Sequence, residues 1–454
     1  MSSGRWYSAI AVSALVVVLL NVPGVADSKA RIVRLSLVEG KVEVDHNANQ
    51  EFASAFLNMP VTEGMSVKTG DDGRAEIEFE DGSAVRLTPK TVARVEQLSL
   101  RDSGARVSIL RLQEGTAYVS FAATKNDEFQ VSFARETATP AVPARFRVQM
   151  NDVDAQLAVF TGEVRVTGPS GEVDAAKKQT VTFDLADQDN YKLAKNIEED
   201  PFDQWDKAQT QYHERYSSAN AYTSSNSSPY AYGTSDLNYY GTYFSAPGYG
   251  TVWQPYFAGA GWDPFSTGAW MYYPGFGYTF VSSYPWGWTP YHYGSWANVP
   301  NYGWCWQPSS VQSGWKTIPT VVTAPNRNPV PVPPATGTGT VLVGGGTPAS
   351  PVVMPGSSLA IRQGSAGLGI PRGSIGNLAK IQSQVERTGY ATHTVHASSV
   401  YAGAPSPVVS SGAIPVAGHS GSAGMHGVTH ASVPSAPHAS PAPHGSSGSH
   451  SSHH

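Results

Sequence analysis

The stretch NMPVTEGMSVKTGDDGRAEIEFEDGSAVRLTPKTVARVEQL, from Asn58 to Leu98, decides the fold because alternating hydrophobicity and a turn signal coincide in it. From Ala75 to Glu80 apolar residues alternate with glutamates, and after Asp81-Gly82 the alternation continues to Leu87. Such alternation is typical of strands with one buried face, and Asp-Gly favours a two-residue turn with positive φ. The stretch therefore predicts a β-hairpin whose glutamates and Arg86 face water.

The same stretch resembles the FecR domain, an extracytoplasmic bacterial module. Three parts of the family pattern follow one another in order: G-x-x-x-x-T-G from Gly64, D-G-R-A-E-I-x-F from Asp72, and D-G-S-x-x-R-L-x-P-x-T from Asp81 to Thr91. The resemblance implies a β-domain that works outside the cytoplasm and is not an enzyme.

A glycine-centred strand pattern recurs three times in the first part of the chain. It reads LVEGKVEV around Gly40, LQEGTAYV around Gly115 and VFTGEVRV around Gly162. Each copy has the pattern of a strand that enters a turn and leaves with alternate valines facing inward. A mainly β fold is expected, with a FecR-like β-sandwich or short β-helix-like domain over residues 30–185.

The N-terminal residues have the pattern of a secretory signal. Arg5 precedes an apolar run from Ala9 to Leu20, and small residues follow at Gly24 and Ala26. We predict a signal peptide over residues 1–26 and an exported protein, periplasmic or extracellular. The alternative is that residues 6–25 stay uncleaved and anchor the chain in the inner membrane.

Charge and composition exclude some classes of function. The formal net charge is −5 and no basic stripe is present. A nucleic-acid partner is therefore excluded, because phosphate binding needs clustered lysines and arginines.

A helix is predicted over residues 200–217. Asp200 suits the N-cap and Pro201 suits the first helical position, where its missing N–H is not needed. The pair His213-Glu214 begins a zinc-protease pattern, but Ser217 stands where the second histidine should be, so no metal site is predicted. The side chains expected to pack from one face of the helix are Phe202, Trp205, Gln209, Tyr212 and Tyr216.

Residues 230–310 are rich in Trp, Tyr, Gly and Pro, and W-x-P units recur in them. This composition predicts short strands and tight turns held together by aromatic packing. The segments YGTVWQP, PWGWTPYHYGSW and YGWCWQP are similar to an uncharacterised Trp-rich family that follows FecR domains in secreted bacterial proteins. That resemblance implies no activity. The W-x-P units begin at Trp253, Trp262, Trp288 and Trp306.

Two interpretations of these aromatic residues are open. They form the core of a segment that has few aliphatic residues, or some of them are exposed platforms for a sugar ring or a partner protein. Most are expected in the core. The densest cluster, which also includes Tyr293, is the candidate ligand-binding surface, with an envelope glycan or an envelope protein as partner. The candidate site residues are Trp286, Trp288, Tyr291, His292 and Trp296.

Residues 311–454 are rich in Pro, Gly, Ser and His, which predicts a largely disordered tail. One helix is the exception, because Ile375, Leu378, Ile381 and Val385 recur at helical spacing and would need a partner to dock on. The tail histidines match no preformed metal site, so a solvating, pH-responsive tail is expected. No cofactor is predicted.

Catalysis finds little support in the sequence. It contains no G-x-S-x-G elbow, P-loop, dinucleotide fingerprint or complete H-E-x-x-H motif. The alternating glutamates are expected at a solvated strand face, not in a general acid–base pair. The remaining enzymatic alternative is a cell-wall polymer hydrolase. Carboxylates that could serve it are Glu76, Glu78, Asp81, Asp152 and Asp154.

Three functional hypotheses follow. The first is an exported, non-catalytic binding or scaffold protein of the bacterial envelope. The second is a periplasmic sensor or regulatory protein related to FecR signalling. FecR itself relays the state of an outer-membrane transporter to a sigma factor through a cytoplasmic N-terminal region, and only residues 1–8 precede the apolar run here. The third is a structural stalk whose aromatic residues self-associate.

Overall fold

The chain is mainly β, as the sequence predicts. The predicted signal segment 1–26 and the histidines after residue 395 lie outside the described residues. No helix within those residues is long and apolar enough to cross a membrane. The computed structural model describes residues 31–45, 51–122, 126–187, 190–217, 232–308, 315–325, 331–344 and 356–395.

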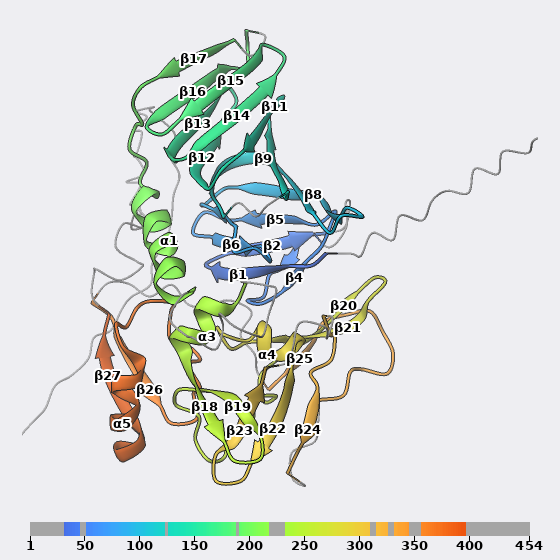
Figure 1. The fold of residues 1–454 in the computed structure, drawn as a ribbon, viewed down its shortest axis with the longest axis vertical. Helices are drawn as coiled ribbons and strands as arrows, with labels where there is room; N and C mark the ends of the chain where they lie inside the picture. The colour runs from blue at the N-terminus through green and yellow to red at the C-terminus, as the bar shows by residue number, and fades with distance from the viewer. Residues whose placement is uncertain are drawn as a thin grey trace, which may run out of the picture. The chain divides into compact units, whose positions relative to one another are not determined.

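The β-domain, residues 31–194, pairs its described strands into one 17-stranded sheet (Figure 1). The pairings form two series that share the long strand β9 (Arg106–Phe121). The first series runs β4 (Pro60–Val61), β1 (Val33–Glu39), β6 (Arg74–Glu78), β7 (Ala84–Leu87), β9, β12 (Ala144–Met150), β13 (Asp154–Thr161), β16 (Gln179–Asp184) and β17 (Tyr191–Ala194). The second runs β3 (Ala53–Ser54), β2 (Val42–Asp45), β5 (Ser66–Thr69), β8 (Val92–Leu100), β9, β10 (Glu128–Phe133), β11 (Glu136–Pro140), β14 (Glu163–Gly168) and β15 (Gly171–Ala176).

The two series enclose one core, so the domain is a sandwich in which the chain passes repeatedly from one series to the other. Val33 and Val119 from the first series share a buried cluster with Val44 and Val95 from the second. This arrangement agrees with the sandwich or short β-helix-like stack that the sequence predicts.

The repeated glycines mark corners where the chain passes between the two series. Gly40, Gly115 and Gly162 have φ of 61°, 86° and 80°. A Cβ on each would lie 2.3, 2.5 and 2.4 Å from a backbone carbonyl oxygen of another segment. Only glycine combines this backbone conformation with so close an approach. The internal repeat seen in the sequence is therefore a repeat of corners.

The hairpin predicted at residues 75–87 is present, because β6 pairs antiparallel with β7. Its turn is longer than predicted: the amide of Phe79 donates to the carbonyl of Ser83, and only Gly82 has positive φ within the turn. This is a three-residue loop that closes with glycine in the left-handed conformation. The prediction that the glutamate face is exposed is wrong. Glu76, Glu78 and Glu80 are only 0, 2 and 4% exposed.

Two helices cover that face near its glutamates. α1 (Asp203–Ser217) begins three residues after the predicted N-cap, although Asp200 still accepts a hydrogen bond from the amide of Phe202. The predicted packing face is confirmed at Trp205, Gln209 and Tyr212, which are buried. The second helix, α3 (Thr234–Tyr240), lies beside α1.

The aromatic region, residues 232–308, consists of short strands and turns, as its composition predicts. Strands contributed by later residues complete its sheets. One sheet has the strand order β18 (Gly241–Ala246), β19 (Gly250–Pro255), β23 (Gly303–Gln307), β22 (Ser295–Val299) and β24 (Val321–Thr323). The other has the order β21 (Gly277–Ser282), β20 (Gly268–Tyr273) and β25 (Val341–Val343). The short helix α4 (Thr289–His292) lies in the chain between β21 and β22.

Part of the segment assigned by composition to the tail is ordered in the structure. β26 (Ser358–Arg362) pairs with β27 (Tyr390–Thr394), and α5 (Leu378–Thr388) lies between them in the chain. The helical spacing noticed in the sequence corresponds to α5, with Asn377 as its N-cap. Its partner is the aromatic core, because Leu378 and Val385 belong to the same buried cluster as the tryptophans.

Candidate functional site: a buried ion network

The aromatic residues predicted as a ligand surface lie in the interior. Trp286, Trp288 and Trp296 are 0% exposed, and Tyr291 and His292 are 1% exposed. The expected exposed platform is therefore not present at these residues. The physical reason is the scarcity of aliphatic side chains in this region, so that the rings themselves form the core.

The rings of this core contact one another at close range. Trp286 stacks on Tyr284 with centroids 4.9 Å apart, and it contacts Trp296 at 6.1 Å. His292 donates from Nδ1 to the carbonyl of Lys316 at 2.7 Å, and burial lowers the pKa of His292 to about 4. The histidine is therefore neutral at pH 7 and serves as a core side chain.

The most unusual cluster of polar groups lies between the β-domain and the helices that cover it. It is a buried ion network, and Glu76 on β6 is at its centre. The sequence pattern indicates that its glutamates share one strand face, but it predicts that this face is exposed to water. It does not predict most of their partners. The members are Arg34, Glu76, Glu78, Arg86, Asp206, His213, Asp236 and Arg372.

Glu76 accepts hydrogen bonds from four side chains, three of which are distant from it in the chain. Arg86, on the neighbouring strand, donates from Nε at 2.7 Å, and Arg372 donates from Nη1 at 2.6 Å. His213 of α1 lies with Nε2 3.0 Å from Oε1 of Glu76, and Ser36 donates its hydroxyl at 2.6 Å. One carboxylate therefore joins the sheet, the helix and the segment before α5.

Asp236 of α3 is the second junction of the network. Its carboxylate accepts from Nε and Nη2 of Arg372, both at 3.0 Å, which is the two-pronged geometry that guanidinium favours. Arg34 of β1 contacts the same carboxylate at 2.6 Å and reaches Glu78 at 3.0 Å. The hydroxyl of Tyr212 donates to Asp236 at 2.8 Å. Helix α3 is thus attached to the sheet by paired charges.

A third junction attaches α1. Arg86 donates to Asp206 at 2.6 Å, and Arg145 of β12 contacts the other oxygen of that carboxylate at 2.7 Å. Asp206 is 0% exposed. A buried carboxylate is stable only when it is paired and hydrogen-bonded, and here both oxygens are paired.

The electrostatics of the network keep its central acid ionised. Burial by itself would raise the pKa of Glu76, but the charges of His213, Arg372 and Arg86 outweigh it and hold that pKa well below its usual value. Burial also acts to raise the pKa of Asp236, and Arg372 and Arg34 lower it by a larger amount. Both carboxylates are therefore permanent anions at neutral pH, fixed by arginines.

Polar contacts outside the network also join the two regions. The side chain of Asn58 donates to the carbonyls of Ser282 and Tyr284 at 3.0 and 2.7 Å. The hydroxyl of Tyr273 donates to the carbonyl of Pro60 at 2.9 Å, and Tyr273 belongs to the β-domain core. The aromatic region therefore packs directly on the β-domain.

A signal for the missed partners does exist in the sequence. After Tyr216 the only acids are Asp236, Asp263 and Glu386, so each charge in that half of the chain is unusual. Asp236 and Arg372 meet in the network, 136 residues apart. Sparse charges in an apolar segment are thus candidates for buried pairs, although the sequence does not show which charges meet.

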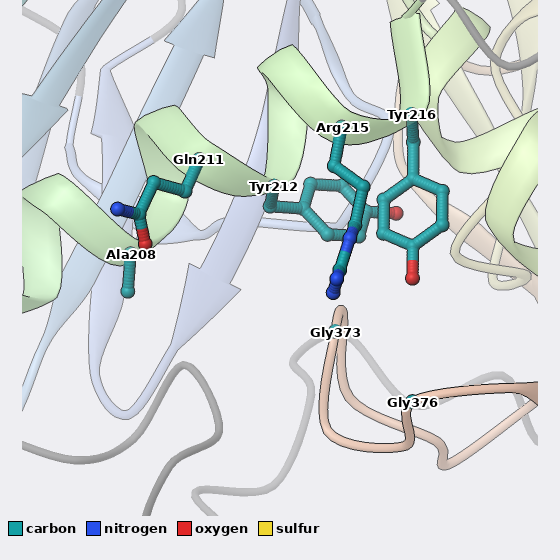
Figure 2. A pocket seen from close by; sticks show the side chains of 7 residues that line it. All are labelled: Ala208, Gln211, Tyr212, Arg215, Tyr216, Gly373 and Gly376. Atoms are coloured by element: carbon teal, nitrogen blue, oxygen red, sulfur yellow. The ribbon is translucent and has the colours of Figure 1, made fainter.

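An open cavity of about 340 Å³ is lined in part by Tyr212, whose hydroxyl also donates to Asp236 of the network (Figure 2). One wall is the C-terminal half of α1 and the opposite wall is the loop before α5. In Figure 2 the side chains of Arg215 and Tyr216 point from the helix toward that loop. The lining residues are Ala208, Gln211, Tyr212, Arg215, Tyr216, Gly373 and Gly376.

Comparison with known families identifies both regions. Residues 65–165 match the family described as FecR protein, and residues 234–328 match a family of unknown function, DUF6600. The chain therefore contains a FecR domain followed by a DUF6600 domain, and the resemblance to FecR is confirmed.

Two crystal structures of a protein proposed to be an anti-sigma factor from Parabacteroides distasonis are similar to the chain. The first is 18% identical with a TM-score of 0.27, over 32% of this chain and 64% of that one. The second is 16% identical with a TM-score of 0.26, over 29% and 59%. The chain thus spans less than two thirds of the length of these structures. No curated protein matches it.

Proposed function

We propose that this protein is an exported, non-catalytic binding or scaffold protein of the bacterial envelope, in which the β-domain and the aromatic region act as one body. One observation carries the proposal: Glu76 of the β-domain is bonded by His213 of α1 and by Arg372 of the segment before α5. A site built in this way fixes the position of one region on the other.

The state of the carboxylates supports a non-catalytic role. A general acid needs a pKa near the working pH, which usually requires that its pKa be raised. The pKa of Glu76 is instead held well below its usual value, and its oxygens are occupied by donors. Glu78 forms a buried ion pair with Arg34 at 3.0 Å. These acids serve as structural anions.

Two sequence features support the envelope as the location. Residues 1–26 have the pattern of a secretory signal, and residues 65–165 match the FecR family, a resemblance that implies a place outside the cytoplasm. The partner class we propose is an envelope glycan or an envelope protein, reached through the exposed surface and not through the buried tryptophans.

Photo-cross-linking in cells tests this proposal. The full chain is expressed with a photoreactive amino acid at Tyr302 or Tyr390, which are 45 and 58% exposed, and at Tyr191 of β17 as a comparison site. Cell fractionation should place the chain in the envelope, and cross-links should join it to a glycan or an envelope protein. Retention of the chain in the cytoplasm, or breakdown of a cell-wall polymer by the purified chain, would overturn the proposal.

The same experiment addresses the sensor alternative, which the FecR match favours. Recovery of an outer-membrane transporter or a receptor from the cross-linked material would move the conclusion to a regulatory protein related to FecR signalling. Recovery of a glycan alone would support the scaffold role.

A further inference from the structure

The cavity beside α1 is lined by polar side chains that are not part of the ion network. Arg215, Gln211 and Tyr216 all line it, and within the described residues none of their side-chain polar atoms has a hydrogen bond or an ion pair. Arg86 and Arg372 of the network are instead paired with buried carboxylates. Gln211 and Arg215 are exposed, so their amide and guanidinium are accessible to a ligand in the cavity.

The spacing on α1 explains why these residues lie along one surface of the helix, where the amide of Gln211 lies beside Ala208 and the side chains of Arg215 and Tyr216 lie nearer the opposite wall (Figure 2). Gln211 and Arg215 are four residues apart, as are Tyr212 and Tyr216, so both pairs lie on neighbouring positions of the helix surface. An arginine in the last turn of a helix also stabilises the helix dipole. That effect accounts for the charge of Arg215, but it does not require an amide and a phenol beside it facing the same cavity.

The opposite wall is built from backbone. Gly373 and Gly376 line it, and a Cβ placed on Gly376 would meet no atom within 4 Å. Gly376 does not have a positive φ, so its backbone does not demand glycine. The absence of a side chain there leaves room in the cavity, and a larger residue would occupy that room without strain in the backbone.

We propose that this cavity binds a sugar that carries a carboxylate, such as a uronic acid unit of an acidic glycan. The guanidinium of Arg215 provides the planar fork that pairs with a carboxylate. The amide of Gln211 and the hydroxyl of Tyr216 match the ring hydroxyls beside it, and the Tyr216 ring offers a face for the sugar ring. The volume of about 340 Å³ suits one or two sugar units.

This inference rests on the proposed function, because it names the partner class of an envelope binding protein. An acidic peptide could also place a carboxylate on Arg215. The sugar is favoured because the cavity combines the cation with an amide, a phenol hydroxyl and an aromatic ring, which match the carboxylate, the hydroxyls and the ring face of such a sugar.

Calorimetry with the full chain tests the inference. The probes are a trimer of galacturonic acid, the neutral trimer of galactose, and a trimer of glutamate. The acidic sugar should bind, and the neutral sugar should bind at least about tenfold more weakly, since it lacks the charge-assisted hydrogen bonds. Equal binding of both sugars, no binding of the acidic sugar at millimolar concentration, or tighter binding of the peptide would overturn the inference.

Three variants locate the binding. Arg215→Gln removes the charge, and Gly376→Leu fills the cavity from the other wall, so each should weaken binding of the acidic sugar by about tenfold or more. Arg387→Gln is the matched control, since Arg387 is an exposed arginine in the last turn of α5. It should bind like the parent. Unchanged binding by both cavity variants would overturn the site.

The cross-linking experiment separates this inference from the proposed function. If Arg215→Gln abolishes sugar binding and reduces glycan cross-links in cells, both stand. If the cross-links persist unchanged in that variant, the protein remains an envelope binding protein and the assignment of this cavity is wrong.

Discussion

The β-domain and the aromatic region build their cores in different ways. The core of the β-domain is mostly aliphatic, and the backbone of its strands is paired in one continuous sheet. The core of the aromatic region consists largely of tryptophan, tyrosine and phenylalanine, and within the described residues its strands are fewer and form two separate small sheets. A region with little regular structure must satisfy its backbone polar groups by other means.

In the aromatic region, side chains donate hydrogen bonds to some of the backbone carbonyls that no strand pairs. Trp286 donates from Nε1 to the carbonyl of Ala366 at 2.7 Å, and Tyr240 donates its hydroxyl to the carbonyl of Ile370 at 2.7 Å. Each ring thus buries apolar area and also pairs a loop carbonyl. The comparison teaches that aromatic residues with a polar atom can replace part of a strand ladder, whereas valine and leucine cannot.

The largest expected effect is at the ion network, where the two regions meet. Glu76→Ala leaves Arg86, Arg372 and His213 without their common anion in a buried site. Removal of one partner from a buried ion pair costs about 3–5 kcal/mol of unfolding free energy. Urea unfolding of the full chain measures it.

The control for this variant is Glu172→Ala, which removes a carboxylate that is half exposed and paired with Arg165. Exposed ion pairs contribute little, so its unfolding midpoint should stay close to that of the parent. Equal midpoints for the two variants would mean that the network does not hold the regions together.

The second prediction concerns two glycines of the β-domain. Gly115→Ala places a Cβ 2.5 Å from the carbonyl oxygen of Lys90 in a backbone with φ of 86°. Gly104 has a similar φ of 81°, but a Cβ there meets nothing within 4 Å. Gly104→Ala should cost about 1 kcal/mol for conformation only, and Gly115→Ala about 3 kcal/mol because the corner must also move. Similar losses in urea unfolding would show that these corners are not tightly packed.

The third prediction concerns the pH dependence of the unfolding free energy, which His292 in the aromatic region should cause. Burial lowers the pKa of His292 to about 4, below the value near 6.5 of an unfolded histidine. Between these values the unfolded state binds the proton and the folded state does not, so stability falls as the pH falls. From pH 7 to pH 5 the loss should be about 2 kcal/mol.

The comparison variant is His292→Phe, which keeps a ring in the core and removes the titrating group. Its unfolding free energy should change less between pH 7 and pH 5 than that of the parent. The carboxylates Glu76 and Asp236 have lowered pKa values and lose their contribution only at more acid pH, so they do not obscure this window. Identical slopes for parent and variant would contradict the assignment of His292 as a neutral core residue.

The sequence predicts the strands well and the burial of the charged face poorly. Alternation between Ala75 and Leu87 shows which side chains share a face, but it does not show what covers that face. The groups that cover it are far away in the chain: His213 is 137 residues from Glu76 and Arg372 is 296 residues from it. Without these partners, glutamates on a strand are expected in water.

The aromatic cluster illustrates the same limit. The density of rings around Trp286 is visible in the sequence. Whether these rings are exposed depends on whether the region has enough other apolar residues to form its core. The opposite error concerns the segment around β26 and α5. Its Gly- and Pro-rich composition predicts disorder, but the structure shows it ordered. Ile361 and Ile370 nevertheless join the aromatic core, because a ready hydrophobic surface lowers the number of apolar residues that the segment itself must supply.

The smallest effect concerns the hydrogen bonds that distinguish the two cores. Tyr240→Phe keeps the ring but leaves the carbonyl of Ile370 without the hydroxyl that lies 2.7 Å away. The expected cost is about 1 kcal/mol, because a buried acceptor loses its partner while the apolar packing stays. Tyr302→Phe is the matched control, since Tyr302 is 45% exposed and water can replace any bond of its hydroxyl. Hydrogen exchange should rise near Ile370 in the first variant only. If both variants unfold like the parent and exchange is unchanged, the aromatic core is held by apolar contact alone, and it differs from the β-domain core only in the shape of its side chains.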